Sequence, residues 1–447
     1  MRSHTRDMTA GSPARLIISF TIPLMIGNIF QQLYTVVDTA IVGKALGVDA
    51  LAALGAADWL NWLMLGLNQG LAQGFAILMA QHFGAKRMAE LRKTIGCSSL
   101  LALVSSVSLL ILGQVLLQPI LDILNTPSDI IGGTSLYLRI MFAGVPIVMA
   151  YNYLSCVLRA LGDSRTPLLA MIVASATNVL LDLLFVLGFR WGIAGAAVAT
   201  LIAQLLSALY CYMQLRKMQQ FHFESADFRV SGSRTWTLFK LGMPMAFQNL
   251  TIAVGGLIIQ SVVNDFGVTF IAGFTATNKL YGILEVAALS CGYAMVTYVG
   301  QNLGAGKIHR IRSGVRAANV MSLLTSLVIG GIMILLGKGI LSAFISGTQE
   351  EYAATMDVAY AYLTTMSIFL PVLYVLHVVR SSIQGLGNTV LPMVSGIAEF
   401  VVRLIAAFTL PTLIGLQGIY YAEVLAWVGA DLILIPGYFL AIRRNKS

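Results

Sequence analysis

The heptapeptide QHFGAKR, residues 81–87, returns 220 residues later as QNLGAGK, residues 301–307. The same spacing separates Gly47-Val48 from Gly267-Val268. Further pairs follow in the same order: Pro23 and Asn28 with Pro244 and Asn249, Tyr137…Pro146…Pro167 with Tyr362…Pro371…Pro392, and Gly192-x-x-Gly195 with Gly415-x-x-Gly418. Matches that keep their order over the whole chain predict two structurally related halves.

The stretches between these motifs are strongly apolar. Of the 447 residues 57% are hydrophobic and 11% are charged, and the mean hydropathy is +0.82, whereas soluble domains carry about 25% charged residues. Twelve apolar runs are long enough to cross a hydrocarbon layer of about 30 Å. They lie at roughly 15–43, 51–80, 93–117, 130–158, 166–187, 192–214, 238–263, 271–300, 316–337, 355–379, 390–410 and 418–441. We therefore predict an all-α polytopic membrane protein with twelve transmembrane helices.

Each half holds six of these spans. Because six is even, both halves run in the same direction through the membrane, which predicts two six-helix bundles related by a pseudo-two-fold axis along the membrane normal. We expect an N-terminal lobe at 1–215, a polar cytoplasmic linker at 216–240 and a C-terminal lobe at 241–447. Two facing bundles favour a secondary transporter over an enzyme. The sequence also carries no Walker A or H-E-x-x-H motif.

The net charge of +9 follows from topology. Of the 28 basic residues, 22 fall on the N-terminus, the even-numbered connections and the C-terminus, while the opposite side holds only Lys44, Arg190 and Lys338. The positive-inside rule then places both termini in the cytoplasm. The excess of positive charge is thus explained without a nucleic-acid partner.

An acid stands inside the first span. Gln31, Thr35 and Asp38 continue a polar stripe that begins at Asn28, with steps of three or four residues along one helical face. A charged group at mid-membrane costs about 2.5–3.5 kcal/mol on insertion scales, so such groups usually face a bundle interior and serve a function. Pro23 precedes the stripe and would loosen the helix locally.

A second acid, Asp182, stands one turn after Asn178 in the fifth span. At 1.5 Å per residue, Asp38 is about 35 Å beyond Arg15, and Asp182 is about 26 Å beyond Arg165, so both fall in the outer half of the membrane. Thr200 enters the sixth span from the same side. We expect Asp38, Asn178, Asp182 and Thr200 to share one depth.

These oxygen groups suit a hard monovalent cation such as Na⁺. They equally suit proton carriage, because two carboxylates held close together in a low dielectric do not easily ionise at once. A structural alternative is that each acid is a satisfied interior group that joins helices. The repeat counterparts of Asp38, Asn178 and Asp182 are Ile259, Arg403 and Ala407, and this asymmetry favours function over a requirement of the fold.

The whole chain resembles the multidrug and toxic compound extrusion (MATE) family, in particular its DinF-like and MepA-like prokaryotic branch. The resemblance is carried by Gly11-Ser-Pro, Ile22-Pro-Leu-Met, the Asp38 segment with Ile41-Val-Gly43, the paired Gln-x-x-Gly-Ala motifs, Leu161-Gly-Asp163 and Asn178-x-x-x-Asp182. It implies a multi-pass protein of a prokaryotic plasma membrane that exports cationic drugs, driven by Na⁺ or H⁺. It also implies that Asp38, Asn178, Asp182, Thr200 and Asn152 form the coupling-cation site, and that the first helix bends at Pro23.

Other residues are candidates for a substrate cavity and for a buried ion pair. A substrate cavity would be lined by polar, aromatic and methionine side chains, which suit hydrophobic cations: Gln31, Tyr34, Tyr137, Met149, Tyr281, Glu285 and Met295. In the second half Glu399 and Arg403 are spaced to form a self-neutralising pair. We expect a monomer whose partners are small organic cations and membrane lipids, with no cofactor and no metal other than a possible Na⁺.

Two other functions remain open at this stage. A flippase for a lipid-linked precursor or polysaccharide could use the same two-bundle architecture, but should carry more cationic side chains in its cavity. A channel is also compatible with the span count, and stoichiometric coupling would distinguish it from a carrier.

Overall fold

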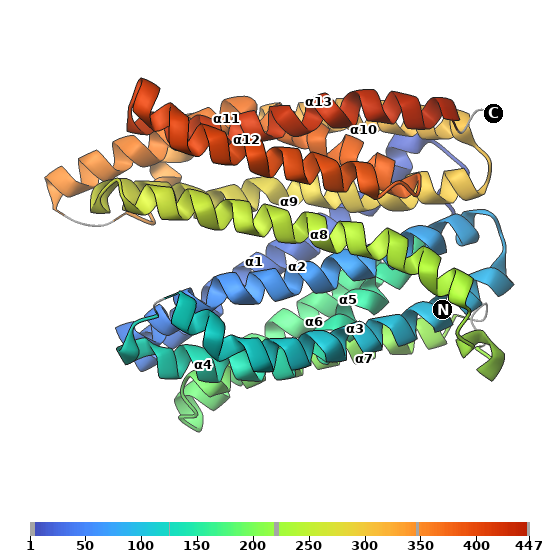
Figure 1. Cartoon of the computed structure of the whole chain (residues 1–447), viewed down its shortest axis with the longest axis horizontal. Coiled ribbons are helices and arrows are strands. Elements are labelled where there is room, and N and C mark those ends of the chain that lie inside the picture. The colour runs from blue at the N-terminus through green and yellow to red at the C-terminus, as the bar shows by residue number, and fades with distance from the viewer. Residues whose placement is uncertain (1–4, 125, 219–222, 346–347, 445–447) are drawn as a thin grey trace. The chain divides into compact units, whose positions relative to one another are not determined.

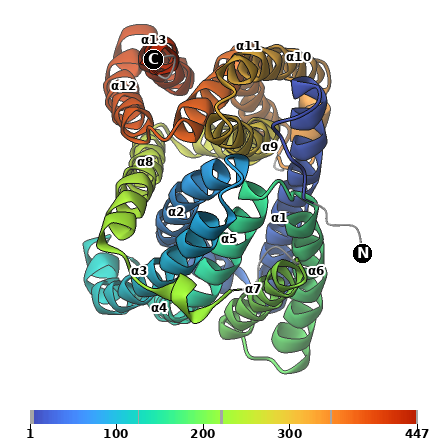
Figure 2. The same ribbon diagram turned by 90° about the vertical axis from the view of Figure 1, so that its right-hand side faces the viewer.

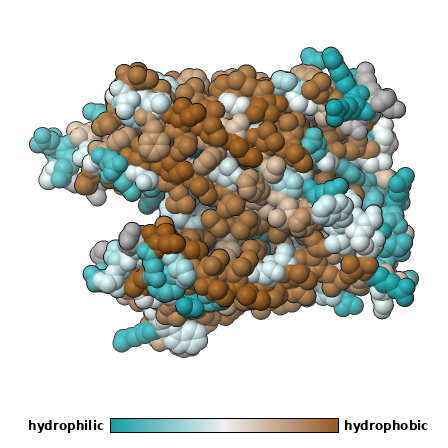
Figure 3. All heavy atoms as spheres, in the orientation of Figure 1, coloured by the Kyte–Doolittle hydropathy of each residue, from teal (hydrophilic) through white to brown (hydrophobic). Residues whose placement is uncertain are grey.

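The computed structural model describes residues 5–124, 126–218, 223–345 and 348–444. Residues 219–222 of the predicted linker lie outside these ranges. Within the described residues the chain is helical and holds no strand (Figure 1). Figure 3 shows hydrophobic residues along the helix surfaces and hydrophilic residues gathered at the helix ends, as a membrane environment requires.

The first repeat contains seven α-helices and one π-helical turn. They are α1 (Pro13–Leu46), α2 (Val48–Gly84), α3 (Met88–Ile123), α4 (Ser128–Ala143), α5 (Val145–Ala160), α6 (Arg165–Asp182), η1 (Leu183–Gly188) and α7 (Ile193–Arg216). A short 3₁₀ turn, η2 (Ser225–Phe228), follows in the connection to the second repeat.

The second repeat begins with α8 (Gly232–Asn264). It continues with α9 (Val268–Gly304), α10 (Ile308–Leu341), α11 (Gln349–Gly385), α12 (Val390–Ile414), η3 (Leu416–Ile419) and α13 (Tyr420–Arg444). Across the described residues eleven helices are long and apolar enough to cross a membrane, or twelve if the bent pair α4–α5 is one span. The predicted all-α fold and its twelve spans are thereby confirmed.

The helices form two compact units. Unit 1 holds Met1–Met8 and Ile22–Asn249, and unit 2 holds Thr9–Thr21 and Leu250–Ser447. The predicted lobes, by contrast, divide at the linker. The two divisions differ because α1 and α8 each begin in one unit and end in the other. In α1 the change falls just before Pro23, and in α8 it falls at Asn249.

In unit 1, α5 lies between α2 and α7 (Figure 2). The buried Tyr153 of α5 donates its hydroxyl hydrogen bond to the carbonyl of Ile95 on α3, at 2.7 Å. Phe75 and Met79 of α2 fill the space beside it in the same apolar core. The hydroxyl of Tyr153 thus finds its hydrogen-bond partner on a neighbouring helix, which allows α5 to be buried on several sides.

In unit 2, α11 is the central helix and contacts α9, α10 and α13. The Phe274 ring of α9 stacks on the Tyr362 ring of α11 with centroids 4.6 Å apart. The hydroxyl of Tyr374 donates to the carbonyl of Leu284 at 2.8 Å. Aromatic stacking and side-chain-to-backbone bonds thus fix α11 against α9.

The fourth predicted span, 130–158, is broken, which the sequence analysis did not predict. α4 and α5 meet at Gly144 with a bend of 49°. A side chain at Gly144 would collide with Leu201 of α7, so the glycine permits a close approach there. Its counterpart α11 stays continuous through Pro371, the repeat equivalent of Pro146. The proline alone therefore does not break the helix.

Small residues let α2 and the first half of α8 touch within unit 1. A Cβ atom added at Gly70 would lie 2.5 Å from the Cα of Ala246, and one added at Gly74 would collide with the backbone of Gly242. Pairs of small residues four apart are a common means of close helix packing in membranes. The backbones meet directly, so no side chain can move aside.

We expect Gly74→Ala to lower the free energy of unfolding by about 1–3 kcal/mol, because overpacking forces the two backbones apart. Gly55 lies on the same helix with no atom within 4 Å of an added Cβ, so Gly55→Ala should be neutral or stabilising by up to about 1 kcal/mol. Thermal unfolding of both variants in detergent tests this. Equal melting temperatures for the two variants would contradict the close contact.

Candidate functional site

Asp38 and Asp182 meet in unit 1. Asp38 lies on α1 and is partly buried, and Asp182 ends α6 with no exposed surface. The two carboxyl groups interact directly with each other. Two acids from different helices therefore share one small volume inside the apolar bundle.

Asn178 and Thr200 lie beside this pair. The amide nitrogen of Asn178 donates to the hydroxyl of Thr200 at 3.3 Å, which joins α6 to α7. Asn178 stands one turn before Asp182 on the same helix face. We call Asp38, Asn178, Asp182 and Thr200 the acid cluster. Asn152 lies half-buried on α5, and its role in cation binding stays a prediction.

The acid cluster has more acceptors than donors. Within the described residues, no hydrogen-bond partner reaches five buried side-chain oxygens: Asp38 Oδ1, Asn178 Oδ1, both carboxylate oxygens of Asp182, and Oε1 of the neighbouring Gln204. Buried polar groups in proteins are normally paired, because an unpartnered one costs about 1–3 kcal/mol and a charged one more. The cluster thus has the chemistry of a site for a cation or proton.

The end of α6 is shaped by a π-helical turn. η1 begins directly after Asp182 and ends at Gly188. The rings of Phe185 and Trp191 stack with centroids 4.7 Å apart, and the backbone N–H of Trp191 donates to the backbone carbonyl of Phe185 at 2.9 Å. π-helical turns occur frequently at functional sites, where they displace one residue from the regular helical register. Here the turn fixes the backbone beside the acid cluster.

A third acid, Asp58, was missed in the sequence analysis. It lies on α2, is exposed, and interacts electrostatically with Asp38 and with Tyr137. The sequence could have identified it, because Asp58 is an acid inside the predicted membrane span at 51–80. Tyr34 interacts with Asp38 and bonds to the side chains of Gln31 and Gln204. Of the predicted cavity residues, Tyr34 and Tyr137 therefore lie near the acid cluster, and Gln31 contacts Tyr34.

Unit 2 contains a buried ion network instead. Arg403 donates to Glu399 at 3.0 Å and to Glu423 at 2.8 Å, and Arg380 donates to Glu399 at 2.6 Å. The arginine side chains are only 5% and 6% exposed. The i, i+4 spacing predicted the contact between Glu399 and Arg403. The pairing of Arg380 with Glu399 and of Glu423 with Arg403 was not predicted, because these partners come from other helices, 19 and 20 residues away.

Two predicted cavity residues of unit 2, Tyr281 and Glu285, lie near this network. His377 is 3.2 Å from Glu285, and the Tyr281 ring stacks on Trp427 with centroids 6.1 Å apart. Met295 has no exposed surface. Met149 of unit 1 is also buried, within the α2–α5 core. The substrate roles of these residues stay predictions.

The two units use corresponding positions differently. Arg403 follows Asn178 by 225 residues, and Glu423 follows Thr200 by 223, which are the repeat offsets of the surrounding motifs. The same pair of positions therefore joins α6 to α7 in the first repeat and α12 to α13 in the second. Unit 1 places a neutral amide against a hydroxyl, and unit 2 places a guanidinium against a carboxylate.

Ionisable groups held inside apolar helices, together with two related bundles, define a class of membrane transporters. Comparison with known proteins is consistent with that class. The MatE family profile matches residues 23–184 and 244–409. The chain belongs to this family, the MATE transporters.

Individual relatives extend the match over the whole chain. A probable multidrug resistance protein of Bacillus subtilis, YoeA, is 26% identical over 99% of this chain and 97% of its own. A second B. subtilis protein of that description, YpnP, is 32% identical over 68% of each chain. The fold matches a MOP superfamily transporter from Pyrococcus furiosus with a TM-score of 0.91 at 21% identity, covering 100% of this chain and 98% of that one.

Family membership confirms the resemblance seen in the sequence. It also confirms that the protein is a transporter rather than an enzyme and that it is a multi-pass membrane protein.

We expect Glu399→Gln to destabilise unit 2 by about 3–5 kcal/mol, because it leaves two buried guanidinium groups without their shared carboxylate. Glu423→Gln should cost less, since Arg403 keeps Glu399 as a partner. Thermal unfolding of the two purified variants tests this order. A larger loss in Glu423→Gln would contradict the central place of Glu399.

Proposed function

We propose that this protein is an antiporter that exports cationic, amphipathic compounds and is driven by inward movement of Na⁺ or H⁺ through the acid cluster. Membership of the MATE family and the multidrug relatives support the export of small organic compounds. The observation that carries the coupling is the fully buried Asp182, whose two oxygens accept no hydrogen bond from a donor group among the described residues and whose carboxyl group lies against that of Asp38. The protein would act as a monomer in a prokaryotic plasma membrane, with both termini cytoplasmic.

The chemistry of the acid cluster supports reversible binding of either a proton or a sodium ion. A buried carboxylate without a partner is costly, so it must take up a proton or a cation. A proton shared between Asp38 and Asp182 would remove their repulsion. A sodium ion would be coordinated by the carboxylates, the Asn178 carbonyl oxygen and the Thr200 hydroxyl, which are the oxygen ligands that a hard cation prefers.

Occupancy could change helix contacts through α1. Asp38 lies on the part of α1 that belongs to unit 1, while the residues up to Thr21 belong to unit 2. Pro23 stands at this change and removes one backbone donor from the helix. In this scheme neutralisation of Asp38 alters the packing of α1 and weakens the hold on the exported compound, which is then released outward.

The alternative is a flippase for a lipid-linked precursor or polysaccharide. A pyrophosphate cargo would call for cationic side chains that are not already neutralised. The buried Arg380 and Arg403 of unit 2 are both bound to carboxylates. This favours cationic over anionic cargo.

Gradient-driven export from proteoliposomes tests the proposal. We expect a fluorescent organic cation to be exported under an imposed Na⁺ gradient or an imposed pH gradient. Asp38→Asn and Asp182→Asn should each reduce export to the level of protein-free liposomes, because a neutral amide cannot be charged and discharged. Asp129→Asn, at the start of α4 and outside the acid cluster, is the matched control and should export normally.

The same experiment distinguishes the alternatives. Export that follows one gradient only identifies the coupling ion, and calorimetric titration with NaCl should then show binding only if that ion is Na⁺. Unchanged export in Asp38→Asn would remove the acid cluster from the mechanism. Active, correctly oriented protein that responds to neither gradient would favour the flippase.

A further inference from the structure

Asp431 of α13 is a buried acid that the proposed mechanism does not use. It lies in the middle of its helix, is 8% exposed, and its Oδ1 atom receives no hydrogen bond from the described residues. α13 packs against α11 and α12, so Asp431 stands inside the bundle of unit 2. An ionisable group inside a membrane span is costly and usually serves a function with an identifiable partner.

The charged groups that act on Asp431 are already joined to each other. Arg380 of α11 and Glu399 of α12 both interact with it electrostatically, and Arg380 donates to Glu399 at 2.6 Å. Arg403 in turn binds both Glu399 and Glu423. Two guanidinium groups therefore meet three carboxylates. Among the described residues, Asp431 is the one of these three that forms no ion pair.

The same group of residues contains a donor without an acceptor. The Nε atom of Arg380 is buried and has no hydrogen-bond partner in the described part of the chain, as is true of Oδ1 of Asp431. Because unpaired buried polar atoms are costly, a side-chain movement that joined Arg380 to Asp431 would satisfy both. Sodium is a poor alternative partner, since it needs several oxygen ligands and the guanidinium repels it. A proton needs only one carboxylate oxygen.

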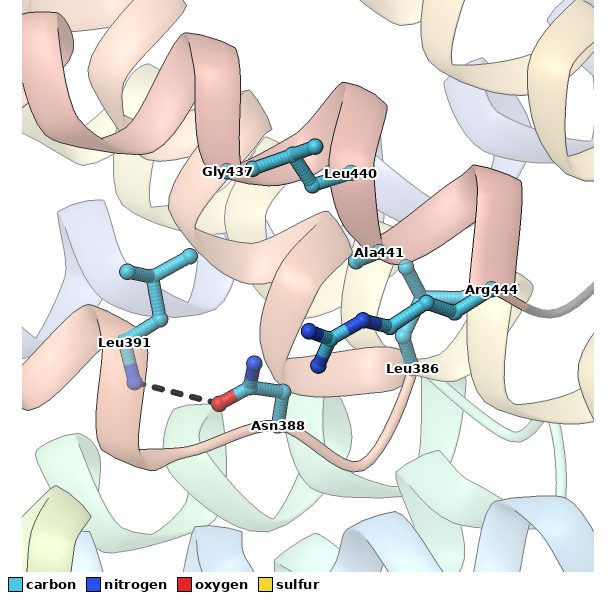
Figure 4. A pocket seen from close by; sticks show the side chains of 7 residues that line it. All are labelled: Leu386, Asn388, Leu391, Gly437, Leu440, Ala441 and Arg444. Atoms are coloured by element: carbon cyan, nitrogen blue, oxygen red, sulfur yellow. Dashed lines mark hydrogen bonds between the residues drawn. The ribbon is translucent and has the colours of Figure 1, made fainter.

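A pocket of about 300 Å³ lies between the last turns of α13 and the connection from α11 to α12 (Figure 4). Its lining extends from the exposed Arg444 to the buried Gly437. Gly437 follows Asp431 by six residues, which is about 9 Å of helix. The pocket thus leaves only a short distance along α13 between the surface of unit 2 and the buried acid.

We propose that Asp431 binds an exchangeable proton, and that loss of this proton draws Arg380 onto Asp431. With the proton bound, Asp431 is neutral and Arg380 holds Glu399 alone, which joins α11 to α12. Without the proton, the Nε atom of Arg380 donates to the Asp431 carboxylate and joins α11 to α13 as well. One protonation event thereby changes which helices of unit 2 are tied together. This inference does not depend on whether the acid cluster of unit 1 drives export.

Infrared difference spectroscopy of the full-length protein in liposomes, between mildly acidic and mildly alkaline pH, tests the proton site. A protonated carboxyl group has a C=O band that is separate from the carboxylate bands. The variant with both Asp38→Asn and Asp182→Asn is the background, because the acid cluster would contribute bands of its own. Adding Asp431→Asn should reduce the remaining pH-dependent band by the amplitude of one carboxyl group. Adding Asp357→Asn, which removes an exposed acid of α11, is the matched control and should leave the band unchanged.

Thermal unfolding tests the link to Arg380 and confirms that each variant is folded. Asp431→Asn, Arg380→Gln and their combination form a double-mutant cycle, and Arg403 still holds Glu399 in Arg380→Gln. The changes in melting temperature should add at acidic pH, where Asp431 is neutral, and should not add at alkaline pH, where the two side chains bind each other.

Two results would overturn the proton site, and neither needs an Arg380 variant. One is an infrared band that Asp431→Asn leaves unchanged, and the other is a carboxyl band of Asp431 that does not respond to pH, which would make the group a purely structural acid. The same degree of additivity at both pH values would overturn the movement of Arg380.

Discussion

The hydrocarbon core of a membrane offers no hydrogen bonds, so a polar group that enters it must find its partner within the protein. Most polar side chains of this chain do so locally. Ser290 and Ser382, for example, donate to carbonyls one turn earlier on their own helices, at 2.7 and 2.6 Å. Tyr374 bonds to the backbone of the neighbouring helix. Asp182 differs from these residues, because its carboxylate is fully buried and receives no hydrogen bond from a donor group among the described residues.

The corresponding positions of the second repeat help to explain why Asp182 receives no hydrogen bond from a donor group. In unit 2 the positions equivalent to Asn178 and Thr200 carry Arg403 and Glu423, which neutralise each other at 2.8 Å. A buried ion pair is weak evidence for stability, but these two positions neutralise each other without an outside ion. Unit 1 keeps the helix geometry and lacks the guanidinium. Under the proposed mechanism its carboxylates are neutralised by a cation or proton that can arrive and leave.

The sequence predicted the features that depend on one helix at a time. Each apolar run was long enough to identify its span, and the i, i+4 spacing identified Glu399 with Arg403. It failed where the outcome depends on a neighbouring helix. At the break between α4 and α5, Leu201 of α7 packs against Gly144, and Arg380 reaches Glu399 from a different helix. Asp58 was overlooked for another reason, because hydropathy averaged over a long span hides one acid.

Asp58 also bears on how an ion would reach the acid cluster. The three acids of this region differ in exposure: Asp58 is exposed, Asp38 is partly buried, and Asp182 has no exposed surface. Negative groups at the mouth of a low-dielectric site raise the local concentration of cations. An exposed carboxylate that acts on Asp38 would therefore attract cations toward the buried pair without holding them there. The buried Asp182, in contrast, has no direct contact with solvent, so in the proposed mechanism a cation would pass Asp58 and Asp38 before it reached Asp182.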